Sequence, residues 1–120
     1  MSVYPYAIDN QLTLPLASAE GDNSNGGNVT QPPITGNYQV MPTDFLIPVG
    51  TITAPVVVTL PASPIIGSTY VIKDANGIAA TYNITVSGNG FNIDGYPTYV
   101  MKVNYETLEV TYDGAWWVIR

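Results

Sequence analysis

The sequence predicts an all-β protein, a small antiparallel β-sandwich or open barrel with an extended N-terminal arm. Ten prolines and eleven glycines among 120 residues interrupt every window long enough for a useful helix. From Tyr38 onward, short runs rich in β-branched and aromatic residues alternate with Gly, Pro and Asn. Many short strands separated by such turns are typical of sandwiches and barrels.

Composition divides the chain into three regions. Residues 1–15 mix apolar and turn-forming residues without helical periodicity, which predicts an extended arm with no core of its own. Residues 16–36 are mostly small or polar, and they predict a flexible linker because they bury too little apolar area to offset the entropy of ordering. A long surface loop is the alternative. Residues 37–120 form the predicted β-domain.

Seven strands are predicted in the β-domain. Alternation is clearest over residues 82–86, where Tyr82, Ile84 and Val86 share one face. Asp113-Gly114 lies between two such runs and predicts a two-residue hairpin, because glycine accepts the positive φ of the turn. The predicted strands are Asp44–Val49, Pro55–Leu60, Thr69–Asp74, Tyr82–Ser87, Tyr99–Val103, Thr107–Tyr112 and Ala115–Ile119.

The low charge of the chain indicates contact with other chains. Only 10% of residues are charged, against about 25% in typical domains. Nine tyrosines, a residue type enriched at interfaces, support a surface partly hidden by copies of the chain; a neutral monomer surface is the alternative. A net charge of −6 with three cations argues against nucleic acid or an anionic membrane as partner. No run is apolar enough to insert into a membrane.

The absence of histidine and cysteine removes Ser-His-Asp and Cys-His catalysis and zinc sites built from these residues. Paired carboxylates for glycoside hydrolysis remain conceivable. The aspartates stand in turn sequences, however, and Glu106 and Glu109 cannot share a strand face. The run 74–77 lacks the later ligands of a calcium loop and predicts a turn. We therefore predict no catalytic residue, no metal site, no cofactor and no enzymatic activity. The carboxylates considered are Asp74, Asp94, Asp113, Glu106 and Glu109.

Aromatic side chains leave two interpretations open. Adjacent strand residues point to opposite faces, so Trp116 and Trp117 cannot both enter one core layer. We expect one in the core and the other against a neighbouring subunit or solvent. An exposed Trp or Tyr beside Asn and Asp also suits stacking on a sugar ring, although subunit or core packing is favoured. The candidates for glycan or subunit contact are Tyr96, Tyr99, Trp116 and Trp117.

Five short motifs follow one another over residues 55–120. They are Val58-Thr-Leu-Pro61, Gly67-Ser-Thr-Tyr-Val-Ile-Lys-Asp-Ala-Asn-Gly77, Tyr82-Asn-Ile-Thr-Val86, Ile93-Asp-Gly95 and Tyr112-Asp-Gly-Ala-Trp-Trp-Val118. In this order the segment resembles a β-module of tail-fibre, head-fibre and other appendage proteins of tailed phages. The resemblance implies a virion protein, made in the host cytoplasm, that assembles as a homotrimer. The chain is short and shows no fibre shaft, which favours a head fibre, capsid decoration or small tail-attached protein.

In that setting, the N-terminal arm would attach the protein to a capsid or tail protein by inserting apolar side chains into grooves. Three arms of one trimer would raise the binding strength about 10²–10⁴-fold over one arm. The rival function is a glycan-binding adhesin, a receptor-binding module of a phage tail. The predicted attachment residues are Tyr4, Tyr6, Ile8, Leu12 and Leu14.

Overall fold

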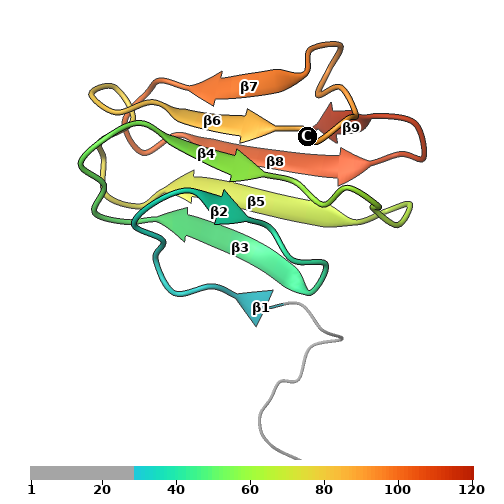
Figure 1. The fold of residues 1–120 in the computed structure, drawn as a ribbon, viewed down its shortest axis with the longest axis horizontal. Helices are drawn as coiled ribbons and strands as arrows, with labels where there is room; N and C mark the ends of the chain where they lie inside the picture. The colour runs from blue at the N-terminus through green and yellow to red at the C-terminus, as the bar shows by residue number, and fades with distance from the viewer. Residues whose placement is uncertain (1–28) are drawn as a thin grey trace, which may run out of the picture.

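Residues 29–120 are described by the structure, a computed structural model, and they form two β-sheets packed face to face (Figure 1). No helix occurs within this range, which confirms the predicted all-β fold. The predicted arm, residues 1–15, and residues 16–28 of the predicted linker lie outside the described range. The strands are β1 (Val29–Thr30), β2 (Tyr38–Gln39), β3 (Asp44–Val49), β4 (Val56–Thr59), β5 (Thr69–Asp74), β6 (Ile84–Ser87), β7 (Thr98–Met101), β8 (Thr107–Tyr112) and β9 (Trp117–Ile119).

The chain alternates between the two sheets from β1 to β6. One sheet has the order β1-β3-β5-β8-β9 and the other the order β2-β4-β6-β7. Because each strand is followed by one in the opposite sheet, the chain returns to its first sheet in the same direction, and the pairs β1–β3, β3–β5, β2–β4 and β4–β6 are parallel. The β5–β8, β6–β7 and β8–β9 pairs are antiparallel.

Antiparallel pairing was predicted throughout, and the parallel pairs correct this part of the prediction. Half-buried strands show the same alternation in either direction, so the sequence pattern does not distinguish the two kinds of pairing. The number of residues between paired parallel strands also varies. Tyr38 pairs with Val58, whereas Leu46 pairs with Val71. The alternation of strands between the two sheets therefore gives no repeat of fixed length in the sequence.

The core lies between the inner faces of the two sheets. In β4, Val56 and Val58 point inward while Val57 points outward. Burial of a Val or Ile side chain stabilises the fold by about 1.5–3 kcal/mol. Aromatic rings close one side of this layer, with Trp117 5.5 Å from Tyr112 and 5.8 Å from Tyr70, measured between ring centroids. The buried apolar residues are Val40, Ile47, Val49, Ile52, Val56, Val58, Leu60, Tyr70, Ile72, Ala79, Ile84, Val86, Ile93, Met101, Leu108, Val110, Tyr112 and Trp117.

Residues 29–36 belong to the folded domain and not to a linker. The Ile34 N–H donates to the Pro48 carbonyl at 2.9 Å, and the Gly50 N–H donates to the Ile34 carbonyl at 2.8 Å. The prediction of a linker over residues 16–36 is therefore wrong for its last part. Composition measures only what side chains can bury, whereas this segment is held by main-chain hydrogen bonds along β3.

The predicted hairpin between β8 and β9 forms, but its turn occupies residues 113–116. Gly114 has a φ of +104°, a conformation that glycine adopts without strain. The Asp113 carboxylate accepts the N–H groups of Ala115 and Trp116, both at 2.9 Å. The extra turn residues are thus fixed by a side chain of the turn itself.

Candidate functional site

Asp74 is a fully buried carboxylate at the end of β5. Burial alone would raise its pKa, but main-chain N–H groups that donate to the carboxylate hold the pKa below its usual value. Asp74 therefore fixes the turn predicted over residues 74–77 and also the connection between β7 and β8. The donors are Asn76 at 3.2 Å, Gly77 at 2.9 Å, Ile78 at 2.8 Å, Ala79 at 2.9 Å and Tyr105 at 2.9 Å.

Glu106 has a similar role beside β7. One of its oxygens accepts the Tyr99 hydroxyl at 2.6 Å, and the other accepts the N–H groups of Lys102 at 3.0 Å and Val103 at 3.1 Å. The hydrogen bond to Glu106, together with burial, raises the pKa of Tyr99. Tyr99, a candidate for glycan or subunit contact, thus has its hydroxyl engaged within the chain.

The remaining candidate carboxylates also hold parts of the fold. Asp94 accepts the Ile119 N–H at 3.1 Å. Glu109 lies 3.7 Å from the guanidinium of Arg120 on the outside of the five-stranded sheet. Within residues 29–120, no three His, Cys, Asp or Glu side chains gather as a metal-binding group. The carboxylates considered for catalysis are accounted for by turns, strand ends and an ion pair.

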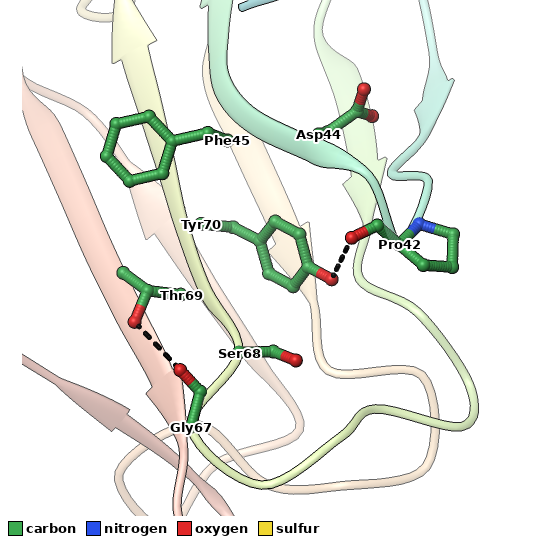
Figure 2. Close-up of a pocket in the computed structure, with 7 residues that line it drawn as sticks. All are labelled: Pro42, Asp44, Phe45, Gly67, Ser68, Thr69 and Tyr70. Atoms are coloured by element: carbon green, nitrogen blue, oxygen red, sulfur yellow. Dashed lines mark hydrogen bonds between the residues drawn. The ribbon is translucent and has the colours of Figure 1, made fainter. Parts of the chain in front are cut away.

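A pocket of about 280 Å³ opens between the starts of β3 and β5 (Figure 2). The Tyr70 hydroxyl points across it and donates to the Pro42 carbonyl at 3.3 Å. Asp44, which lines the pocket, is buried, and its carboxylate accepts the Tyr38 hydroxyl at 2.7 Å and the Met41 N–H at 2.8 Å. Burial of Tyr38 and its hydrogen bond to Asp44 raise the pKa of Tyr38 to about 12. The lining residues are Pro42, Asp44, Phe45, Gly67, Ser68, Thr69 and Tyr70.

The two tryptophans divide as the strand pattern predicts. Trp117 is completely buried, and its indole Nε1 has no hydrogen-bond partner among the described residues. Trp116 is 53% exposed and Tyr96 is 71% exposed. Trp117 is therefore corrected from a contact candidate to a core residue. Of the candidate aromatic residues, Tyr96 and Trp116 offer a largely free ring. The predicted attachment residues, from Tyr4 to Leu14, lie outside the described range.

Exposed apolar side chains gather in the connections at one end of the sandwich. This end holds the β2–β3, β4–β5, β6–β7 and β8–β9 connections, on the right in Figure 1. The β4–β5 connection touches the β8–β9 turn, because a Cβ at Gly114 would lie 3.3 Å from Ile66 Cδ1. We call this region the apolar end. Its large exposed side chains are Met41, Ile65, Ile66, Tyr96 and Trp116.

Within β2, β4, β6 and β7, no Asp, Glu, Lys or Arg points to the outer face of the four-stranded sheet. Alternation in β4, β6 and β7 turns every second residue outward, and the register aligns Val57, Thr85 and Val100 in one row. The outer face of the five-stranded sheet differs, since it holds the Glu109–Arg120 pair. The sequence showed a shortage of charge but not its location. We call the following residues the uncharged face: Gln39, Val57, Thr59, Thr85, Ser87, Thr98 and Val100.

No protein-family model matches the chain, and a search of the curated proteins finds no significant match. Among residues 29–120, no helix has the length and apolar character needed to cross a membrane.

Proposed function

We propose that the protein is a structural component of a phage particle, a head fibre, capsid decoration or small tail-attached protein. Its β-domain associates with copies of itself, and its N-terminal arm attaches it to a capsid or tail protein. The order of motifs over residues 55–120 supports the assignment to a phage appendage. Self-association is supported chiefly by the uncharged face.

The uncharged face supports association because of the charge on the rest of the chain. The net charge is −6, so two copies of the chain repel each other on average, most strongly where carboxylates meet. A surface of Thr, Ser, Gln and Val avoids this repulsion. Its half-exposed valines, Val57 at 40% and Val100 at 38%, gain from removal of water.

A non-enzymatic role agrees with the state of the carboxylates. Catalysis by a carboxyl pair requires groups that are free to meet a substrate. Asp74 and Glu106 instead accept several hydrogen bonds from the main chain. The protein acts by binding and assembly.

Light scattering on the full chain over a range of concentrations tests self-association. The expected result is a mass of more than one chain; the resemblance implies three. A single-chain mass at every concentration would contradict the proposal.

Attachment is tested by co-sedimentation with particles of the source phage. We expect Leu12→Asp to abolish it, because a carboxylate does not enter an apolar groove. Thr13→Asp, which adds the same charge at a polar position, is the control and should sediment with particles. Equal sedimentation of both variants would argue against the arm.

Glycan binding is the second candidate, supported by the exposed rings of Trp116 and Tyr96 at the apolar end. Exposed aromatic faces can stack on sugar rings. A glycan array probed with the full chain should then give signals that Trp116→Ala removes. A blank array would exclude this candidate and leave the structural role in place.

A further inference from the structure

The two C-terminal edge strands differ in how their outward main-chain groups are satisfied. At the edge of the five-stranded sheet, the Trp117 N–H of β9 donates to the Asn92 carbonyl at 2.9 Å, and its carbonyl accepts the Asp94 N–H at 3.0 Å. The next outward N–H, that of Ile119, donates to the Asp94 carboxylate at 3.1 Å. Residues 92–94 therefore cover the β9 edge.

At the edge of the four-stranded sheet, no segment within residues 29–120 covers β7 in this way. The Ser87 carbonyl of β6 faces β4, where it accepts the Leu60 N–H at 2.9 Å, and Gly88 donates to the Pro97 carbonyl at 3.0 Å. With the β6–β7 register, this alternation directs the main-chain groups of Tyr99 toward β6 and those of Thr98 and Val100 away from the sheet. No hydrogen bond between described residues engages these outward groups.

We propose that β7 pairs with β7 of a second copy, antiparallel and about a two-fold axis at Tyr99, to form one sheet that runs through both copies. This inference rests on the proposed self-association and names its contact; a two-fold contact joins two copies, whereas the resemblance implies three. Thr98 and Val100 lie symmetrically about Tyr99, and each offers one donor and one acceptor. Thr98 of one copy therefore bonds with Val100 of the other, and the pattern is self-complementary.

The residues that flank β7 agree with antiparallel pairing. Pro97 lacks an N–H, but its main-chain groups face β6, so the new ladder does not need that donor. Continued along the chain, the same register brings Lys102 of one copy opposite Tyr96 of the other. An ammonium beside an aromatic ring is favourable. Parallel pairing would instead place the two lysines together.

The side chains of β7 also suit a second copy. Thr98 and Val100 belong to the uncharged face, so pairing extends this face across both copies without placing like charges opposite each other. Tyr99, half-buried on the inner side, lies opposite Tyr99 of the second copy. The occupant of the β7 edge is thus another copy of this chain, and the contact is a dimer contact.

The first test replaces a single main-chain donor. Val100→Pro removes the outward N–H at a position where an edge strand tolerates proline. Val100→Thr keeps the N–H and the β-branched shape. We expect Val100→Pro to lower the mass of the full chain to that of one copy, 12.9 kDa, and Val100→Thr to keep the two-chain mass.

The second test uses charge and reads the register. Val100→Glu places two carboxylates diagonally across the axis, where residues lie about 7–8 Å apart, and we expect loss of the dimer. Adding Thr98→Lys puts a lysine directly opposite each glutamate, and we expect the double variant to regain the two-chain mass. Failure of this rescue, with both variants folded by circular dichroism, would overturn the register.

Amide hydrogen exchange on the unmodified chain tests the same contact without substitution. Exchange at Thr98 and Val100 should slow as the protein concentration rises, whereas exchange at Ile119, bonded within its own chain, should not change. Exchange independent of concentration at all three positions overturns the β7 contact. A three-chain mass unaffected by Val100→Glu also overturns it but leaves the proposed function standing; a single-chain mass for the unmodified protein contradicts both.

Discussion

The edge strands β7 and β9 show how one connection can cover the edge of one sheet while the edge of the other has no partner among residues 29–120. The segment between β6 and β7 first runs along β9, where residues 92–94 bond to Trp117 and Ile119, and only then enters β7. Residues 92–94 therefore pair with β9 and do not cover β7. An uncovered edge is a site for pairing with another chain unless charge or proline blocks it. Here the strand itself carries neither.

The largest expected effect comes from removing the buried ring of Trp117, which begins β9. Trp117→Ala leaves a cavity beside Tyr70 and Tyr112 and should lower the free energy of unfolding by about 3–5 kcal/mol. Urea denaturation measures this change. Trp116→Ala is the control, and because its ring is 53% exposed, a much smaller loss is expected. Equal losses would show that β9 is not held by its buried ring.

The second-largest expected effect concerns Asp74, which ends β5 and binds the connection between β7 and β8. Asp74→Asn weakens the charge-assisted bonds to Tyr105 and to the turn over 75–79, and we expect a loss of about 2–3 kcal/mol at neutral pH. The folded-state pKa of Asp74 is lowered, so its contribution is present above the unfolded value of 3.8 and is lost as pH falls through the folded pKa. Urea denaturation between neutral pH and pH 2 should show a shallower acid decline in the variant. An unchanged decline would exclude this role.

At the other edge of the four-stranded sheet, β2 should respond to alkali. The pKa of Tyr38 is raised from 10.0 to about 12, so the folded state holds this proton more tightly than the unfolded state. Its contribution is complete below pH 10 and is lost as pH rises toward 12. Tyr38→Phe should flatten the decline in unfolding free energy above pH 10. The same slope in both proteins would mean that the Tyr38 hydroxyl is neither buried nor bonded to Asp44 in solution.

The smallest expected effect comes from Asp94, and it compares the β9 and β7 edges directly. Asp94→Ala frees the Ile119 N–H and should lower the unfolding free energy by about 1 kcal/mol. Amide exchange should accelerate at Ile119 and stay unchanged at Thr98. Faster exchange at both positions would indicate general loosening rather than an opened β9 edge.

Strand positions were predictable because alternation and turn residues are local signals. All seven predicted strands occur, three with the predicted bounds and four with ends shifted by one or two residues. The strands β1 and β2 were missed, since each has two residues and depends on main-chain bonds to a neighbour. The direction of pairing was also beyond local reasoning, because it depends on which strand the chain returns to.

The candidate site was predictable only where it depends on local sequence signals. The division between Trp116 and Trp117 follows from strand geometry, and Asp74 and Asp113 stand in turns as their sequences predict. The uncharged face and the open β7 edge could not be found in this way. They arise from residues on β2, β4, β6 and β7, and their grouping depends on sheet order.

The passage of the chain between sheets also constrains how the molecule acquires its structure. The hairpins β6–β7 and β8–β9 join consecutive strands and need little chain closure. The parallel pairs β3–β5 and β4–β6 each enclose a strand of the opposite layer, so neither layer can be completed before the other. Because such pairings are remote in sequence, we expect refolding on the millisecond-to-second scale. A chain folded only as far as β6 would lack β7 in one sheet and β8 and β9 in the other.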